Sequence, residues 1–218
     1  GDVAGILCAQ YLGAQALVTT VSSNTAVELC RAFVQVKRTR IGSPYVIEGI
    51  EQLIESGVQT VVGYEPNGGF LVGTSLKKNG KILLPLMTRD AVLPILCLLS
   101  LARENACKVS ELTQRLPARY TASDRLQDFP TDTSHEILLN LAASSAAIAG
   151  LMAGLCGRAV KLDQTDGLRI FLEGDEIVHF RPSGNAPELR CYAESASQER
   201  SEYLVQASLQ RMQSKRVV

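Results

Sequence analysis

Residues 180–190 read FRPSGNAPELR and join two stretches whose composition favours β-strands, residues 177–180 and 189–193. Pro, Gly and Asn form turns, because Pro fixes φ, Gly permits positive φ and Asn tolerates the left-handed region. Such a turn can aim several backbone N–H groups into one concavity that binds an anion. Ser183 would add a hydroxyl group and Asn185 an amide, and the flanking arginines carry guanidinium groups that match phosphate oxygens in pairs. The alternative is an ordinary hairpin loop with solvated Arg181 and Arg190, and the residues alone leave both interpretations open.

The composition is that of an ordinary globular protein. The chain has 218 residues, enough for one large domain or two small ones, with 46% hydrophobic and 20% charged residues. The 22 basic residues balance 22 acidic residues, so the formal net charge is zero. Nucleic-acid binding in bulk requires an excess of positive charge, so we expect no nucleic-acid partner and only a local anion site.

The cysteines and the hydrophobic stretches predict where in the cell the protein is located. The six cysteines form no Cys-x-x-Cys pair and several lie in apolar runs, which favours free thiols in a reducing cytoplasm over disulfides or zinc. Only His135 and His179 could serve a His-based metal site, which argues against one. No stretch predicts a transmembrane helix or a signal peptide, because the apolar runs are short or rich in Ala, Ser and Gly. We therefore expect a cytoplasmic protein without a membrane partner.

The first half of the chain predicts a layered α/β domain with a largely parallel sheet. Strand-like runs at residues 16–21, 33–37 and 60–65 alternate with helical patterns at 43–56 and 90–105. Ser43 followed by Pro44 is typical of a helix N-cap and first turn.

The second half predicts a smaller α+β domain with an antiparallel sheet and two helices. The expected helices are residues 134–156 and 197–211, and residues 124–133 are expected to form a polar loop. Short strands are expected at 158–162, 168–172, 176–180 and 189–193, with Gly-containing hairpin turns between them. We expect the domains to be 1–110 and 111–218.

The turn also carries a resemblance. Residues 181–194 closely resemble the R-P-S-G-T-E-P-x-x-R-x-x-x-E signature of the α-D-phosphohexomutases, the phosphomannomutase/phosphoglucomutase family, and TDGLRI at 165–170 resembles the segment ahead of that loop. Asn185 and Ala186 stand where Thr and Glu are usual. The resemblance implies a loop that grips the non-reacting phosphate of a hexose phosphate. Its phosphate-binding residues would be Arg181, Ser183, Gly184, Asn185 and Arg190.

Two shorter stretches resemble the family's sugar-binding parts. GYEPNGGF at 63–70 is similar to its sugar-binding loop, in which Glu65 would accept from two hydroxyl groups and Asn67 replaces the usual Ser. Gly69 stands where the family often has His. In TRIG at 39–42, Arg40 stands where a basic residue approaches the substrate. The alternatives are a turn or helix cap for Glu65 and an ordinary surface arginine for Arg40.

The resemblance covers the third and fourth of the family's four domains. Neither the phosphoserine loop nor the D-G-D-x-D-R loop that holds Mg²⁺ occurs in this sequence. It implies the C-terminal, substrate-binding half of an enzyme that interconverts hexose 1-phosphate and 6-phosphate, with Mg²⁺ and the missing N-terminal domains outside this chain. Because phosphoryl transfer needs an in-line donor and a cation, we expect this chain alone to be inactive, with no catalytic residue or metal ligand of its own.

Two other interpretations stay open. The chain could be a free-standing, non-catalytic phosphosugar-binding module, although its start at Gly1 without Met favours a piece of a longer protein. A nucleic-acid binder that uses Lys215 and Arg216 is disfavoured by the zero net charge. The residues do not distinguish mannose, glucose and N-acetylglucosamine phosphates.

Overall fold

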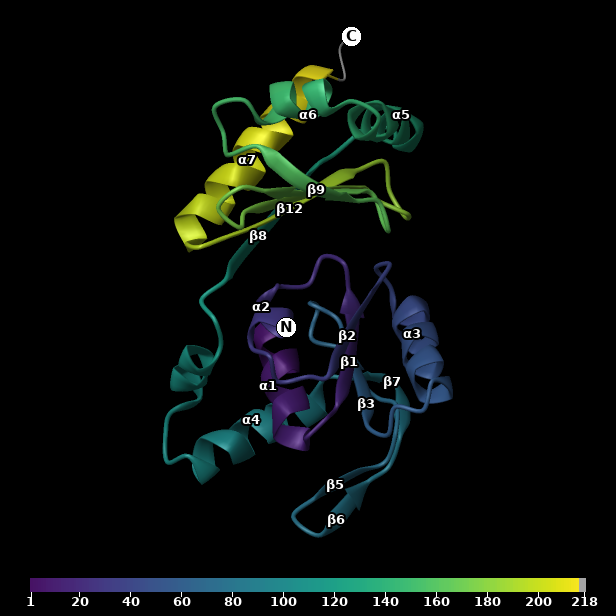
Figure 1. Ribbon diagram of the computed structural model, residues 1–218, viewed down its shortest axis with the longest axis vertical. Helices are drawn as coiled ribbons and strands as arrows, with labels where there is room; N and C mark the ends of the chain where they lie inside the picture. Colours follow the sequence, from purple (N-terminus) through teal and green to yellow (C-terminus); the bar gives the residue numbers. More distant parts are fainter. Residues whose placement is uncertain (216–218) are drawn as a thin grey trace. The chain divides into compact units, whose positions relative to one another are not determined.

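The computed structural model describes residues 1–215, and its contacts divide the chain into two units, Gly1–Ala118 and Arg119–Val218 (Figure 1). The sequence-based boundary lies earlier, after residue 110. The structure keeps the 3₁₀-helix Val109–Arg115 with the first unit, because Leu112 is fully buried in that unit's core.

The first unit is built on a five-stranded mixed sheet with the order β2-β1-β3-β4-β7. β1 runs parallel to both β2 and β3, whereas β4 and β7 are attached antiparallel. The expected largely parallel sheet is therefore only half parallel, because hairpin connections follow β3 where crossover helices precede it. The strands are β1 (Ala16–Thr20), β2 (Gln35–Thr39), β3 (Val61–Tyr64), β4 (Phe70–Val72) and β7 (Leu86–Asp90).

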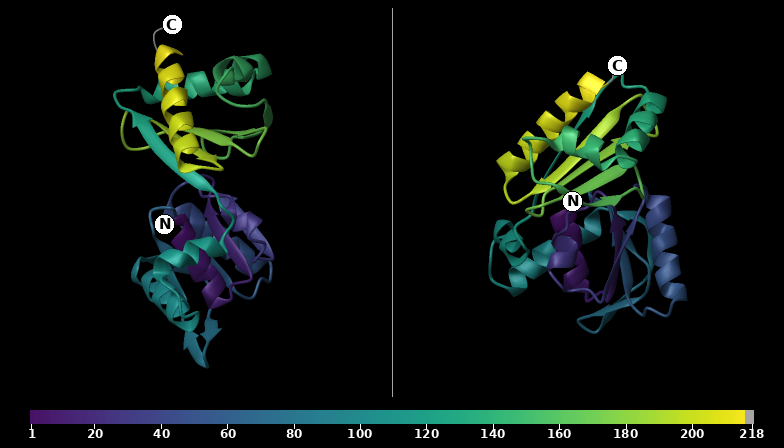
Figure 2. Two further views of the ribbon diagram at one scale, coloured as in Figure 1. Left: turned by 90° about the vertical axis from the view of Figure 1, so that its left-hand side faces the viewer. Right: turned by 45° about the horizontal axis from the view of Figure 1, so that its top comes forward.

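Helices cover both faces of this sheet, as expected for a layered α/β domain. Alternation along β1 sends Leu17 into a core with α1 (Asp2–Leu12) and α4 (Val92–Glu104). The next residue, Val18, points into a second core with α3 (Ser43–Glu55), which lies on the other side (Figures 1 and 2). A short helix, α2 (Ala26–Leu29), joins β1 to β2, and β5 (Leu76–Lys78) with β6 (Lys81–Leu83) forms a separate hairpin.

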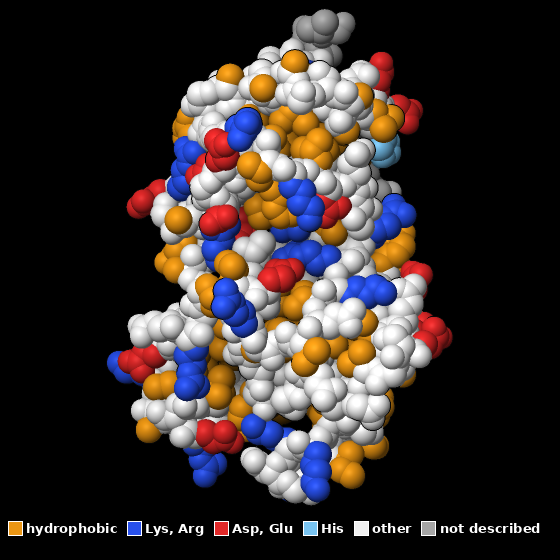
Figure 3. All heavy atoms as spheres, in the orientation of Figure 1, with side chains coloured by type: hydrophobic (Ala, Val, Ile, Leu, Met, Phe, Trp, Pro, Cys, Tyr) orange, Lys and Arg blue, Asp and Glu red, His pale blue; other side chains and the backbone are white. Residues whose placement is uncertain are grey.

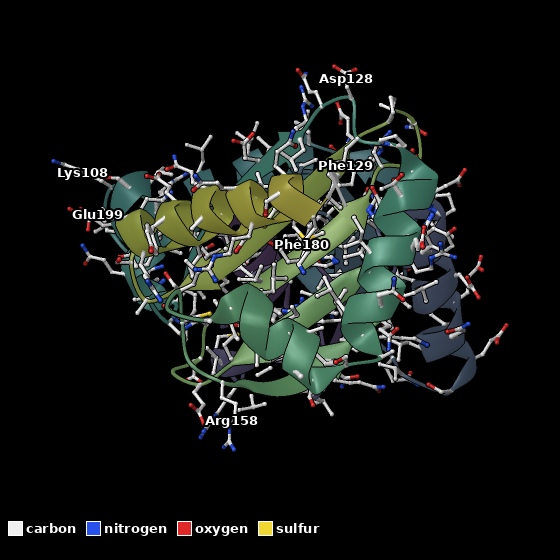
Figure 4. The ribbon with its side chains drawn as sticks, turned by 90° about the horizontal axis from the view of Figure 1, so that it is seen from above. Lys108, Asp128, Phe129, Arg158, Phe180 and Glu199 are labelled. Carbon is white, nitrogen blue, oxygen red and sulfur yellow. The ribbon has the colours of Figure 1, made fainter. Side chains whose placement is uncertain are left out.

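The second unit is an α+β domain with an antiparallel five-stranded sheet in the order β8-β12-β11-β10-β9. Its helices lie on one face of the sheet (Figure 1), and in Figure 4 Phe180 lies beneath them whereas Arg158 and Glu199 point outward. Phe180 is fully buried. The elements are β8 (Tyr120–Leu126), β9 (Ala159–Asp163), β10 (Leu168–Leu172), β11 (Ile177–Pro182), β12 (Leu189–Ser195), α5 (Thr131–Ala142), α6 (Ser145–Met152) and α7 (Gln198–Lys215).

Two expectations for the second unit are wrong in detail. The helix predicted at 134–156 is two helices, α5 and α6, bent by 107°. Ser144 causes the break, because its hydroxyl accepts the Ala147 N–H at 3.1 Å and caps α6. The unit therefore has three α-helices within the described residues, and the first residues of the predicted polar loop, 124–126, belong to β8.

The surface features of the two units follow the composition. Figure 3 shows basic and acidic side chains interspersed on the face in view. No single helix of residues 1–215 is long and apolar enough to cross a membrane, and only the bent pair α5–α6 passes that test, by length and composition alone. Lys215 is the last residue of α7, and Arg216 lies outside the described residues. All six cysteines are free thiols.

Candidate functional site

The first candidate site lies at the carboxyl ends of the parallel strands in the first unit. The chain leaves β1 for β2 on one side, and β3 pairs with β1 on the other. A reversal of this kind opens a crevice at which α/β sheets bind ligands. Glu65 is the first residue after β3 and is buried, with 4% of its surface exposed.

Hydrogen bonds hold Glu65 in place. Ser43 Oγ donates to Glu65 Oε2 at 2.7 Å, and the Glu65 N–H donates to the Gly69 carbonyl at 2.9 Å. The sequence predicts Ser43 as an N-cap, but Gly42 holds that position and no side chain of residues 1–215 caps α3. Ser43 instead orients the carboxylate, a role that its place beside Pro44 does not indicate.

Asn67 and Arg40 lie in the turns at the same edge of the sheet. Asn67 Oδ1 accepts the Gly69 N–H at 3.0 Å, which closes the loop and leaves the amide nitrogen outside that bond. The Arg40 guanidinium lies 5.0 Å from the centroid of the Tyr45 ring and is exposed, in the turn between β2 and α3. The structure therefore places Glu65, Asn67 and Arg40 on loops that follow β3 and β2.

The second candidate site is the turn between β11 and β12 in the second unit. Pro182 pairs with Leu189, so residues 183–188 form the turn. The Ser183 N–H donates to the Glu188 carbonyl at 2.8 Å, and the Asn185 N–H lies 3.5 Å from Ser183 Oγ. Ser183 is only 3% exposed, whereas a Cβ added at Gly184 would meet nothing within 4 Å. The turn therefore combines a fixed serine with an open backbone.

The two arginines that flank the turn have different partners. Arg181 Nε donates to Asp166 Oδ2 at 2.9 Å, and both side chains are largely buried. Arg190 Nη2 lies 3.6 Å from Glu188 Oε2, and its buried Nε has no hydrogen-bond acceptor in the described part of the chain. Arg181 is thus oriented within the unit, whereas Arg190 has an unfilled donor.

His179, on β11 just before the turn, contacts Asp166 and Tyr192. Its Nε2 lies 2.6 Å from the Asp166 carbonyl oxygen, so Nε2 carries the proton that this oxygen accepts. Its ring stacks on Tyr192 with centroids 5.5 Å apart. Burial lowers the pKa of His179 from 6.5 to about 4, so the ring is neutral near pH 7. Asp166 therefore binds Arg181 through its carboxylate and His179 through its backbone carbonyl. The site predicted from the sequence includes neither Asp166 nor His179.

The described residues do not form a metal site. No group of three or more His, Cys, Asp or Glu side chains among residues 1–215 is arranged to hold an ion. The carboxylates at the two candidate sites are instead engaged by Ser43 and by arginines. The described residues therefore do not fit Mg²⁺.

The chain consists of an α/β unit followed by an α+β unit, and both units match domains of one protein family. Residues 1–120 match the family model described as phosphoglucomutase/phosphomannomutase, alpha/beta/alpha domain III, and residues 106–210 match that described as the C-terminal domain. The chain belongs to the phosphoglucomutase/phosphomannomutase family and carries its third and C-terminal domains. The resemblance and the fold class predicted from the sequence are thereby confirmed.

Individual relatives agree with this assignment. The chain is 42% identical over 216 residues to a phosphomannomutase of Salmonella muenchen and 40% identical over 211 residues to one of Sinorhizobium fredii. These matches cover 99% and 96% of this chain but 44% of each relative. The chain thus spans less than half the length of these curated relatives.

Solved structures show the same fold. A putative phosphomannomutase from Thermus thermophilus has a TM-score of 0.63 at 20% identity, over 98% of this chain and 40% of that one. An Aspergillus fumigatus N-acetylphosphoglucosamine mutase in complex with GlcNAc-6P and magnesium has a TM-score of 0.64 at 15% identity, over 98% and 43%.

Proposed function

We propose that this chain is the substrate-binding half of a phosphohexomutase that interconverts hexose 1-phosphate and 6-phosphate. Family membership and the names of two relatives, both phosphomannomutases, support this proposal. Because the chain spans 44% of those relatives, the activity itself belongs to a longer polypeptide.

The turn at 183–188 carries the proposal, because it has the donors that a phosphate group needs. Ser183 is buried and held by the Glu188 carbonyl, and the backbone at Gly184 is open to an approaching group. Asn185 adds an amide, and Arg181 and Arg190 stand at the two ends of the turn. Donors fixed in advance bind an anion without the entropic cost of ordering them.

Glu65, Asn67 and Arg40 would bind the sugar. Ser43 occupies one lone pair of Glu65 Oε2, and the remaining carboxylate lone pairs can accept from two adjacent hydroxyl groups. The Asn67 amide nitrogen and the exposed Arg40 guanidinium are donors for sugar oxygens. Binding at these points orients the reacting hydroxyl group through interactions at the non-reacting end of the substrate.

This chain supplies binding and orientation, not the phosphoryl donor. The sequence contains neither a phosphoserine motif nor a D-G-D-x-D-R motif, and its described residues do not fit Mg²⁺. We place the donor and Mg²⁺ in the part of the protein outside this chain, and expect no mutase turnover from the chain alone. Turnover by a pure preparation would contradict this expectation. The cytoplasmic location and the absence of nucleic-acid and membrane partners stay predictions.

The proposal is tested by titration calorimetry of the chain with mannose 1-phosphate and with glucose 6-phosphate. We expect a dissociation constant between high micromolar and about 1 mM, which corresponds to roughly 4 kcal/mol. Ser183→Ala and Arg181→Ala should each weaken binding by at least about tenfold, because each removes a donor to a charged group.

A matched control is Arg158→Ala in the same unit. Its side chain is 80% exposed, lies just before the edge strand β9 and pairs with Glu173. This variant should bind like the native chain. Native-like binding by both Ser183→Ala and Arg181→Ala, or no binding by the folded native chain at several millimolar, would refute the proposed site.

A further inference from the structure

Three arginines lie side by side on neighbouring strands of the second unit. Arg181 on β11 pairs in register with Arg190 on β12, and Arg190 pairs with Arg125 on β8. Directly opposed residues share one face of an antiparallel sheet. The sequence neighbours Phe180 and Cys191 are buried in the helix-covered core, so this arginine row (Arg181, Arg190 and Arg125) points to the other face.

Such a row needs negative charge, because like charges directly opposite destabilise a sheet. Asp166 lies 2.9 Å from Arg181 and satisfies it. Glu188 forms ion pairs with the other two, at 3.3 Å from Arg125 Nε and 3.6 Å from Arg190 Nη2. Both separations exceed the length of a normal hydrogen bond, so the Glu188 carboxylate makes only weak ion pairs with Arg125 and Arg190.

Asp124 also lines a cavity beside Arg125 and Arg190. It pairs in register with Cys191, whose side chain is in the core, and its Oδ1 accepts the backbone N–H of Arg125 at 2.8 Å. Among the described residues, the three guanidinium groups of the arginine row therefore form ion pairs with two carboxylates, those of Asp166 and Glu188.

This cavity lies beside Arg125 and Arg190. Its volume is about 350 Å³, within the range of roughly 300–1,000 Å³ that is typical of small-ligand pockets. Arg190 Nε is buried at this place without an acceptor among the described residues, and an unfilled buried donor is costly. The cavity is lined by Ser123, Asp124, Arg125, Arg190 and Tyr192.

We propose that this cavity is a phosphate subsite, in which Arg125 and Arg190 together bind a phosphomonoester dianion. The hydroxyl groups of Ser123 and Tyr192 donate to the same group, and Glu188 moves away from the arginines when the anion enters. The inference rests on the proposed function, since a hexose phosphate supplies the dianion. It extends the proposed phosphate-binding residues from the turn at 183–188 onto β8, whose residues 124–126 are expected from the sequence to form a loop.

A dianion fits this subsite better than Glu188 does. A phosphate group has three terminal oxygens, so it can accept from both guanidinium groups at normal hydrogen-bond length and fill Arg190 Nε. Glu188 is tied to the turn through its backbone N–H, which donates to the Ala186 carbonyl at 2.8 Å. Because its backbone is fixed there, its carboxylate stays near Arg125 and Arg190 and competes with an anionic ligand for them. Removal of this charge should therefore strengthen ligand binding.

The test is titration of the chain with mannose 1-phosphate and, separately, with inorganic phosphate. Arg125→Ala should weaken binding of both about tenfold, and Glu188→Gln should strengthen it about threefold, because the competing charge is lost. Arg158→Ala, an exposed arginine of the same unit, should change affinity less than about twofold. Thermal unfolding of each variant checks that it is folded.

The opposite sign expected for Glu188→Gln separates this role from a structural one. Native-like binding by folded Arg125→Ala, or weaker binding by folded Glu188→Gln, would overturn the inference. If Ser183→Ala abolishes binding while Arg125→Ala does not, the inference fails and the proposed function stands. If the folded native chain binds neither ligand at several millimolar, both fail.

Discussion

At the scale of single residues, His179 links the candidate phosphate turn to the stability of its unit. The ring is 2% exposed, contacts the Asp166 carbonyl and stacks on Tyr192. Burial is the main cause that lowers its pKa to about 4, and the nearby Arg169 and Arg181 act in the same direction. An unfolded chain exposes this histidine with a pKa near 6.5.

Acid should therefore destabilise the protein through His179. Between pH 6.5 and pH 4 the unfolded state binds a proton that the folded state does not, so the free energy of unfolding falls as pH falls. The loss should approach about 3 kcal/mol near pH 4, at about 1.4 kcal/mol for each unit of the shift. Urea unfolding of the native chain and of His179→Gln between pH 4 and pH 8 measures it.

The His179→Gln variant should lose this part of the pH dependence, whereas His135→Gln, at an exposed position of α5, should keep it. An NMR titration of the folded chain that puts the His179 pKa near 6.5 would rule out this account of the acid sensitivity.

Two glycines near the same turn should differ sharply. Gly167 has φ of 81°, and a Cβ there would lie 2.2 Å from the Phe180 carbonyl oxygen. Gly167→Ala should therefore cost more than about 2 kcal/mol of stability, because backbone must shift and the left-handed conformation is strained. Gly184→Ala meets nothing within 4 Å and should change stability by less than about 1 kcal/mol. Chemical denaturation of both variants tests the contrast, which equal losses would disprove.

At the scale of elements, the strands around the turn are predictable because local composition decides them. The predicted runs 168–172, 176–180 and 189–193 match β10, β11 and β12 closely. β8 is only partly predicted, because its exposed edge carries polar residues and its partner, β12, lies far along the chain. The sequence alone therefore does not predict a role for Arg125, since only the strand register brings it next to Arg190.

The break between α5 and α6 is the second failure at this scale. Helical residues run almost without interruption through 134–156, so periodicity predicts one helix. The single residue Ser144 ends this continuity, because its hydroxyl accepts the Ala147 N–H in place of a backbone carbonyl and so starts a new helix, α6. In the first unit, local patterns predict α3, but not that Ser43 turns its hydroxyl to Glu65.

The cap can be tested by substitution of two adjacent serines. Ser144→Ala should destabilise the second unit by about 1 kcal/mol, since the Ala147 N–H loses its acceptor. Ser145→Ala, at the exposed first position of α6, should cost less than about 0.5 kcal/mol, because alanine favours a helix. Thermal or urea unfolding measures both, and an equal effect of the two substitutions would show that Ser144 does not act as a cap.

At the scale of the whole molecule, each unit has cores of its own. The clusters around Leu17 and Val18 contain only residues before 119, and the cluster around Phe180 contains only later ones. Residues 1–118 and 119–218 are also long enough to bury a core, as domains of about 100 residues commonly do. The physical requirements for independent folding are therefore met by each unit separately.

We accordingly expect separate polypeptides 1–118 and 119–218 each to unfold in one cooperative transition in urea. The cut matters at one residue, because Arg119 Nε pairs with Glu194 Oε1 at 2.7 Å and the two side chains are 8% and 6% exposed. A polypeptide of residues 120–218 loses this buried ion pair, and the partner left behind makes such a loss cost about 3 kcal/mol or more. It should therefore unfold at a clearly lower urea concentration than 119–218. If 119–218 shows no cooperative transition, or if removal of Arg119 leaves its midpoint unchanged, the second unit depends for its stability on contacts other than its own core and this ion pair.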